Sequence, residues 1–312
     1  MSRSGTLLAA LWLGLGMGFP TVTLGATPVT ETEAAAFQSH YLVGPSQGWP
    51  VSLPHKKDIP PGETGKLIRR GIDILERTSY TIGPHAAPSH RAAVNNLNCV
   101  SCHAMGDTDL PGTRPGQLPF VHVIHEYPKF DPKSMSVMTI QDRVRGMSGG
   151  GNGRLTDNSD DMKAIVAYFQ WLGHYTRPGS SMAGAHLKSI PSPTRMPDSD
   201  RGKVLYQNRC AVCHGDSGLG IQAADFDSGG GYVVPPIAGT DSFTDGGHLA
   251  NEVIFARFIW GYMPKGATPK NPQLKVMDAY DIARYVSRME RKKDPNRSKY
   301  YPSAAYPEPT VR

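Results

Sequence analysis

Two pentapeptides in this chain place two cysteines and a histidine at the same spacing, CVSCH at residues 99–103 and CAVCH at residues 210–214. The Cys-x-x-Cys-His pattern is typical of covalent attachment of c-type haem. Residues three apart share a face of one helical turn, so both sulfurs reach the two vinyl groups along one porphyrin edge. The next side chain, His103 or His214, then faces the iron as its proximal ligand. The pattern predicts two covalently bound haem c groups, held by Cys99, Cys102, Cys210 and Cys213.

Other roles are known for cysteines at this spacing. A lone Cys-x-x-Cys can be a thioredoxin-like redox pair or half of a zinc site, and secreted cysteines often form disulfides. In this chain a histidine follows immediately both times, and with 4 cysteines in all, none is left over. Both facts favour haem attachment.

Length and composition agree with two loop-rich domains. A length of 312 residues suggests about two domains, and the two haem motifs require two. The 34 glycines and 27 prolines indicate much loop and few long regular elements. The formal net charge is +6, but no basic stripe with interleaved aromatic residues is present. The absence of such a stripe argues against a nucleic-acid partner.

The first residues have the features of a secretory signal peptide. Arg3 gives a positive start, residues 7–19 are apolar, and small residues follow at Gly25 and Ala26. This order predicts a signal peptide over residues 1–26. No later apolar run reaches the length of a membrane span, so no transmembrane anchor is expected after cleavage. Export followed by haem attachment is typical of a cytochrome of the bacterial periplasm, which is the location we expect.

Amphipathic helices must position the two motifs. Apolar residues recur at helical spacing from near Gly65, where Leu67, Ile68, Ile72 and Leu75 make one stripe. The same spacing predicts further helices over about 159–174, from about 199, over 249–260 and from near 278. Residues 107–133 contain five prolines and are expected to be loop.

The two halves of the chain repeat one another. Cys99 corresponds to Cys210 with a shift of 111 residues, and Met147 corresponds to Met263 with a shift of 116. Each half therefore runs helix, haem motif, long loop, methionine, closing helix. That order resembles a class I cytochrome c domain, in which the first and last helices pack together and the loop between them wraps the haem. The expected fold class is all-α, with two fused class I cytochrome c domains and long haem-wrapping loops.

Composition and repeat together set the expected boundaries. They are a signal peptide at 1–26, a first domain at 27–176, a linker at 177–198, a second domain at 199–294 and a tail at 295–312.

Methionines in equivalent places are the expected sixth ligands. Met263 lies 49 residues beyond His214 and is followed by Pro264, whose turn would present the sulfur. A methionine is more often a core filler, but the repeat favours ligation. For the first haem we expect Met147, 44 residues beyond His103. Its rivals are Met135, Met138, His122 and His125.

Each proximal histidine also needs a partner for its other ring nitrogen, usually a backbone carbonyl. For His214 we expect this carbonyl within residues 234–237. A proline-rich turn without that role is the equal alternative.

Beyond cytochrome c in general, the chain resembles the dihaem thiosulfate dehydrogenase family over nearly all of its mature length. The resemblance rests on residues 65–78, 98–103, 142–144, 152–153, 161–172 and 263–264. It implies oxidation of thiosulfate to tetrathionate in the periplasm, with electrons passed to another carrier. It also implies that the first haem is the catalytic one and carries a cysteine thiolate as its distal ligand.

The sequence departs from that family at the distal ligand. Met147 stands where the family has its cysteine, and the haem motifs use all 4 cysteines of the chain. The family's Arg-Ser pair after the ligand is also absent, and Tyr262 precedes Met263 where the family can have a lysine. The scaffold therefore matches while the catalytic residues do not.

Three functions follow, in this order. The first is electron transfer by a dihaem cytochrome whose irons are both six-coordinate, exchanging electrons with small periplasmic redox proteins. The second is an active thiosulfate dehydrogenase with a displaceable Met147, in which Arg143, Arg145 and Arg154 bind the anion. A solvated basic face is the commoner role of such a cluster. The third is a dihaem peroxidase, for which no motif is present. The sequence alone does not decide whether the chain is an enzyme.

Overall fold

The protein is described here from a computed structural model that covers residues 44–131, 135–148 and 154–294. The predicted signal peptide and the predicted tail lie outside these residues. Within the described ranges, no helix has both the length and the apolar character needed to cross a membrane.

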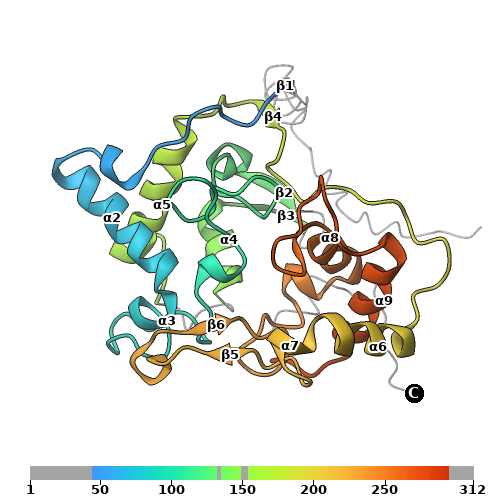
Figure 1. The fold of residues 1–312 in the computed structure, drawn as a ribbon. Helices are drawn as coiled ribbons and strands as arrows, with labels where there is room; N and C mark the ends of the chain where they lie inside the picture. The colour runs from blue at the N-terminus through green and yellow to red at the C-terminus, as the bar shows by residue number, and fades with distance from the viewer. Residues whose placement is uncertain (1–43, 132–134, 149–153, 295–312) are drawn as a thin grey trace, which may run out of the picture. The chain divides into compact units, whose positions relative to one another are not determined.

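The described chain is mostly helical, in agreement with the predicted all-α class (Figure 1). Its longer helices are α2 (Gly62–Glu76), α4 (Ile140–Met147), α5 (Asp160–Gly173), α6 (Ser199–Arg209), α8 (Glu252–Tyr262) and α9 (Val276–Ser287). The one-turn helices are η1 (Lys56–Asp58), α3 (Thr78–Thr81), η2 (Cys99–Ser101), η3 (Val123–Glu126), α7 (Ala211–His214), η4 (Phe226–Ser228) and η5 (His248–Ala250).

Strands form only two-stranded ladders in the described residues. β1 (Gly44–Gln47) pairs in parallel with β4 (Ser180–Met182). β2 (Lys129–Asp131) and β3 (Ser136–Met138) are antiparallel, as are β5 (Ile221–Gln222) and β6 (Tyr232–Val234). These short ladders lie within the connections between helices and leave the helices to form the cores.

The first and last helices of each half pack against each other, α2 on α5 and α6 on α9 (Figure 1). A glycine permits each crossing. A Cβ atom at Gly71 would lie 2.3 Å from the Ala164 carbonyl oxygen, and one at Gly202 would lie 2.0 Å from the Asp281 carbonyl oxygen. Both distances are far below van der Waals contact, so only glycine lets the backbones come this close. The helix pairing expected from the class I cytochrome c order is therefore present in both halves.

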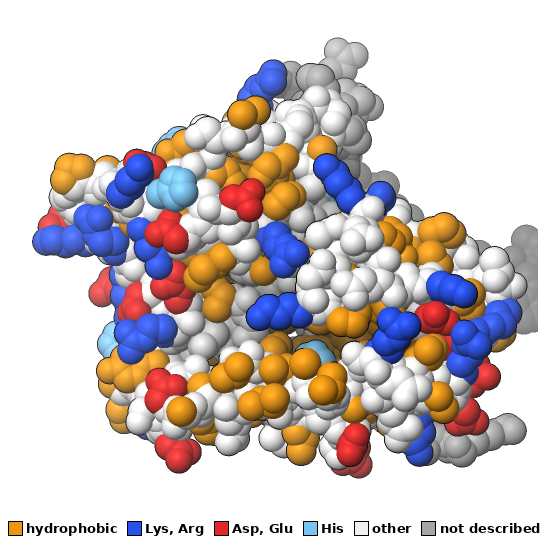
Figure 2. All heavy atoms as spheres, in the orientation of Figure 1, with side chains coloured by type: hydrophobic (Ala, Val, Ile, Leu, Met, Phe, Trp, Pro, Cys, Tyr) orange, Lys and Arg blue, Asp and Glu red, His pale blue; other side chains and the backbone are white. Residues whose placement is uncertain are grey.

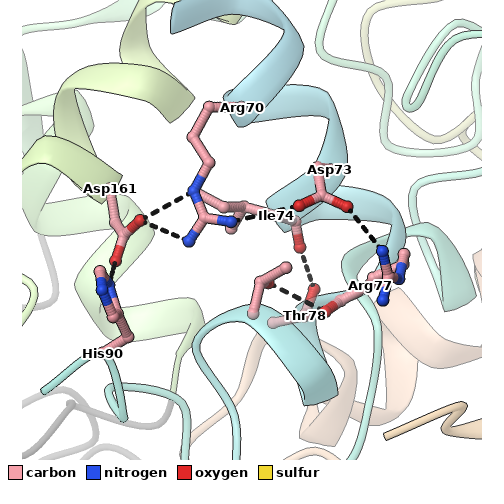
Figure 3. A network of polar contacts seen from close by, with 8 residues as sticks. Arg70, Asp73, Ile74, Arg77, Thr78, His90 and Asp161 are labelled. Carbon is pink, nitrogen blue, oxygen red and sulfur yellow. Dashed lines mark hydrogen bonds and ion pairs between the residues drawn. The ribbon is translucent and has the colours of Figure 1, made fainter. Parts of the chain in front are cut away.

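An ion pair spans each crossing beside the glycine. Arg70 on α2 donates to Asp161 on α5 at 2.8 Å, and His90 contacts the other carboxylate oxygen at 2.7 Å (Figure 3). In the second half Arg201 on α6 pairs with Asp278 on α9 at 2.7 Å. The sequence repeat thus extends to an Arg-Gly pair on one helix and an aspartate on the other. The Arg70 and Arg201 side chains keep 36% and 53% of their surface exposed. Solvent screening therefore limits each pair to about 1 kcal/mol, and apolar packing carries the crossing.

Two hydrophobic cores correspond to the two halves. The first is built on α2 and α5, and the second on α6, α8 and α9. Ile68, Ile72 and Leu75 are buried as predicted, but Leu67 is 39% exposed and Ile74 is fully buried instead. The prediction for Leu67 is wrong. Ile74 lies two turns further along nearly the same face and is fully buried, so this face of α2 is covered at Ile74 and open at Leu67. Met182 and Ala185, from the range expected to be linker, belong to the first core.

The glycine crossing leads to a stability prediction. Gly71→Ala should lower the free energy of unfolding of the first half by about 1–3 kcal/mol, because the added methyl group forces α2 and α5 apart. Gly146→Ala is the matched control, since a Cβ there meets no atom within 4 Å. It should be neutral or stabilising by up to about 1 kcal/mol through helix propensity. Urea unfolding of the haem-loaded variants measures both, and equal effects would contradict the crossing argument.

Candidate haem sites

Each Cys-x-x-Cys-His motif forms a single helical turn. In the first, the His103 backbone N–H donates to the Cys99 carbonyl at 3.0 Å. In the second, the His214 N–H donates to the Cys210 carbonyl at 2.9 Å. All four cysteines are free thiols. The turn brings the two thiols and the imidazole of each motif to the arrangement that the spacing predicted.

Both histidine rings are held by a backbone carbonyl. His103 Nδ1 lies 2.5 Å from the Leu118 oxygen, and His214 Nδ1 lies 2.9 Å from the Pro235 oxygen. Pro235 falls within the predicted 234–237 stretch, so that expectation is confirmed. The Leu118 partner was not predicted. A ring nitrogen that faces a carbonyl must carry the proton, which leaves the lone pair on Nε2 for an iron.

Electrostatics keeps both imidazoles in the form that binds a metal. Burial lowers the pKa of His103 to about 4, against the opposing effect of the Leu118 carbonyl. The positive charge of Arg143 lowers it further. Burial also lowers the pKa of His214. Because both shifts disfavour the imidazolium, both rings are neutral at pH 7.

Buried groups fix the first motif in place. The Thr78 hydroxyl lies 3.2 Å from the Cys99 sulfur and accepts a hydrogen bond from the Cys99 N–H at 3.0 Å. Phe120 stacks on the His103 ring with centroids 4.3 Å apart. Sequence reasoning missed both residues, since a buried threonine and a core phenylalanine carry no pattern of their own.

Met147 is the last residue of α4 and is 48% exposed. Arg143 lies one turn earlier, at the i, i+4 spacing that shares a helix face. The charge of Arg143 acts on the His103 ring. Met147 as the sixth ligand of the first haem stays a prediction.

The two candidate arginines differ in their partners. Arg145 forms ion pairs with Asp142 at 2.5 Å and with Asp157. The Arg143 guanidinium makes no hydrogen bond or ion pair to any described residue. Of the two, only Arg143 has a guanidinium that is not already neutralised by neighbouring carboxylates in the described part of the chain.

The rival ligands of the first haem occupy other positions. His122 Nε2 lies 2.8 Å from the Ser180 carbonyl oxygen, and His125 Nε2 lies 2.9 Å from that of Gly173. Met138 is on β3, and Met135 is 74% exposed. Both histidines use Nε2 for a backbone contact, and the Nδ1 of His122 is buried without a partner in the described residues. The sixth ligand of the first haem therefore stays a prediction.

Met263 directly follows α8 and is the residue that ends it. Its N–H donates to the Ile259 carbonyl at 2.9 Å, and its half-buried side chain packs against the second core. The Ala267 N–H donates to the Pro264 carbonyl at 2.9 Å and closes the turn that follows. Met277 and Met289 also pack against this core, in the places expected of core residues.

Apolar side chains are exposed around the second motif. Figure 2 shows hydrophobic groups over α7 and the β5–β6 hairpin. Val212, Leu219, Ile221 and Val233 are each between 47% and 82% exposed there. Cys213 is exposed as well. The second motif is therefore at the protein surface.

The residues present fit haem c at both motifs. Each offers two free thiols and a neutral imidazole with Nε2 available. On α8, the buried Nε of Arg257 has no partner in the described residues, and a haem carboxylate is the kind of group that would satisfy it. When bound, the haem supplies one-electron oxidation and reduction.

Comparison with known proteins agrees with this geometry. A family model described as cytochrome c matches residues 199–290. A thiosulfate dehydrogenase of Psychrobacter arcticus is 33% identical over 264 residues, covering 84% of this chain and 75% of the relative. That of Allochromatium vinosum is 32% identical over 240 residues, covering 76% and 82%. The chain belongs to the thiosulfate dehydrogenase family.

A solved structure extends the similarity to the fold. Thiosulfate dehydrogenase (TsdBA) from Marichromatium purpuratum, in its as-isolated form, matches 91% of this chain with a TM-score of 0.69 and 24% identity. This chain spans 56% of the length of that one. The protein is thus a thiosulfate dehydrogenase-like cytochrome c that binds haem c, with the all-α cytochrome c fold that the sequence predicted.

Proposed function

We propose that the protein is a periplasmic dihaem c-type cytochrome that transfers electrons on a thiosulfate dehydrogenase scaffold. Cys99, Cys102 and His103 hold one haem, and the corresponding residues of the second motif hold the other. Support comes from the matching geometry of the two motifs, each with one helical turn and one carbonyl bound to the histidine. The predicted signal peptide supports the periplasmic location.

The observation that carries this proposal is the methionine at residue 147, where the family resemblance implies a cysteine. Met147 and Met263 are the methionines that the repeat and the helix ends favour, and Met147 stands in place of the family's cysteine. With a histidine and a thioether on each iron, neither has an open position for a substrate. A thioether is neutral and raises the reduction potential, whereas a thiolate lowers it. Both properties suit electron transfer.

The second motif is the exit that we assign to the electrons. Its attachment residue Cys213 and the apolar side chains around it are exposed. A small redox protein, such as another cytochrome, would dock on this surface. The short distance between the two docked redox proteins then allows electron transfer without a substrate-binding step.

Thiosulfate oxidation is the second candidate, and Arg143 is the observation that favours it. This reaction joins two thiosulfate ions through a new sulfur–sulfur bond and releases two electrons, which two one-electron centres can take. A cationic side chain without a carboxylate partner in the described residues, next to the first motif, is suited to bind such an anion. Arg145 is not suited to this role, because two carboxylates already neutralise it.

The haem content is the first test. The mature chain should carry two haems through thioether bonds, because both motifs have free cysteines on one turn. Denatured protein should keep its red colour, and its mass should exceed that of the signal-cleaved polypeptide by two haems. Extraction of the pigment into acid-acetone would contradict covalent attachment.

Met263→Ala tests the ligand of the second iron. The near-infrared sulfur-to-iron charge-transfer band of that haem should disappear, because its thioether ligand is gone. The matching band of the first haem should stay. Met277→Ala is the control, since Met277 packs against the same core without following α8. A band that survives in Met263→Ala would show that another residue holds the iron.

Met147 separates the two candidate functions. Unmodified protein should exchange electrons with small redox proteins, yet reduce ferricyanide with thiosulfate slowly or not at all. Met147→Cys should give a thiolate-type electron spin resonance spectrum at the first haem. Met138→Cys, at the rival methionine, should not. Rapid tetrathionate formation by the unmodified protein would contradict the carrier proposal and support the enzyme.

A further inference from the structure

A tyrosine from the second half of the chain reaches into a loop of the first. Tyr262 is the last residue of α8, is 5% exposed and immediately precedes Met263. Its hydroxyl donates a hydrogen bond to the Pro115 carbonyl at 3.1 Å. Pro115 lies between the first haem motif and Phe120, so this contact joins the two halves.

The other end of the same loop holds the first proximal histidine. Leu118, three residues after Pro115, is the residue whose carbonyl lies 2.5 Å from His103 Nδ1. Leu118 also packs against the second core rather than the first. It has φ +52, a backbone conformation that costs energy for a leucine and persists where the surroundings impose it. The loop is therefore held by the second half at both Pro115 and Leu118.

The contact with Tyr262 is closely fitted. Gly116 has φ +72, and a Cβ atom there would lie 2.2 Å from the Tyr262 hydroxyl oxygen. The Arg114 guanidinium lies over the Tyr262 ring, 5.6 Å from its centroid. Only glycine at position 116 leaves room for this hydrogen bond.

We propose that Tyr262 is a positioning residue that couples the two haem sites, by tying the predicted ligand Met263 to the loop whose carbonyl orients His103. This inference rests on the proposed two-haem function. The carbonyl bound to Nδ1 makes the imidazole a stronger donor to the iron, which favours the oxidised state and lowers the potential. A loop released by Tyr262 would weaken that bond and raise the potential of the first haem.

Coupling of this kind acts in both directions. A change of ligation or charge at the second site that moves Met263 also moves Tyr262, and through Pro115 and Leu118 it reaches His103. By thermodynamic linkage the first site affects the second by the same free energy. Each of the two reduction potentials then depends on the state of both haem sites.

Tyr262→Phe removes the hydroxyl and keeps the ring. The measurement uses the full haem-loaded protein. The equilibrium constant for electron exchange between the first haem and a reference mediator should shift at least threefold toward the reduced haem. That is a rise of about 28 mV, since a tenfold change is 59 mV for one electron. Spectroelectrochemical titration measures it, and the first haem is the one that keeps its near-infrared sulfur-to-iron band in Met263→Ala.

Tyr280→Phe is the matched control. Tyr280 is 4% exposed, and its hydroxyl also donates to a proline carbonyl, that of Pro191, at 3.2 Å. Tyr280→Phe removes the same type of hydrogen bond from the second half without changing the loop of the first half. The potential of the first haem should stay at the wild-type value. An equal shift in both variants would show a general structural effect and overturn the proposal.

A second pair of variants tests the contact from the loop side. Gly116→Ala places a methyl group against the Tyr262 hydroxyl and should also raise the potential of the first haem. Gly179→Ala has the same backbone strain, with φ +67, but no atom within 4 Å of its Cβ, and should leave that potential unchanged. This pair decides the question even where Tyr262→Phe does not fold.

The outcomes are distinct. One haem per wild-type chain would overturn the proposed function. Two haems with an unmoved first potential in Tyr262→Phe and Gly116→Ala would overturn the coupling alone. The halves stay joined in these variants through Asn96, whose side-chain amide donates to Asp241 at 3.0 Å. A shift therefore reports the lost contact and not separation of the halves.

Discussion

The hydrogen bond from each motif histidine to a backbone carbonyl is the interaction on which both candidate haem sites depend. It fixes the tautomer and orientation of the ring, so that Nε2 and the two thiols of the same turn act together. The acceptors are 15 and 21 residues downstream of His103 and His214. A loop must therefore return to each motif and stay there, and much of the remaining structure serves to hold these two loops.

The two halves hold their loops in different ways. In the second, the Ile237 and Ala238 N–H groups both donate to the Gly218 carbonyl, so the loop that contains Pro235 is anchored beside its own motif. In the first, the loop from Pro115 to Leu118 is anchored on Tyr262 and on the second core. The first site is thus completed by the second half, whereas the second site has its own support. The two halves repeat one another in sequence but differ in how their loops are anchored.

A shared scaffold leaves the chemistry to a few residues. The glycine crossings, the ion pairs beside them and the carbonyl-bound histidines build a cytochrome c fold with haem sites, and none of them selects a substrate. The sixth ligand and the nearby charges do that. Met147 stands where the family resemblance implies a cysteine ligand, and the Arg143 guanidinium has no carboxylate partner in the described residues. The two candidate functions that we propose depend on these two residues.

Sequence alone determined what depends on short spacing. The haem motifs follow from residues three and four apart, and helix α5 at Asp160–Gly173 agrees with the predicted 159–174 because its apolar period is local. The repeat predicted Met147 and Met263 as ligands, which stay predictions, and the expected stretch 234–237 contains the carbonyl that His214 contacts. Tertiary structure decided the rest: the Leu118 carbonyl, the exposure of Leu67, and which of Arg143 and Arg145 is paired. The Tyr262–Pro115 contact joins residues 147 apart. Such contacts depend on how two cores pack together, and no local pattern of residue types records that.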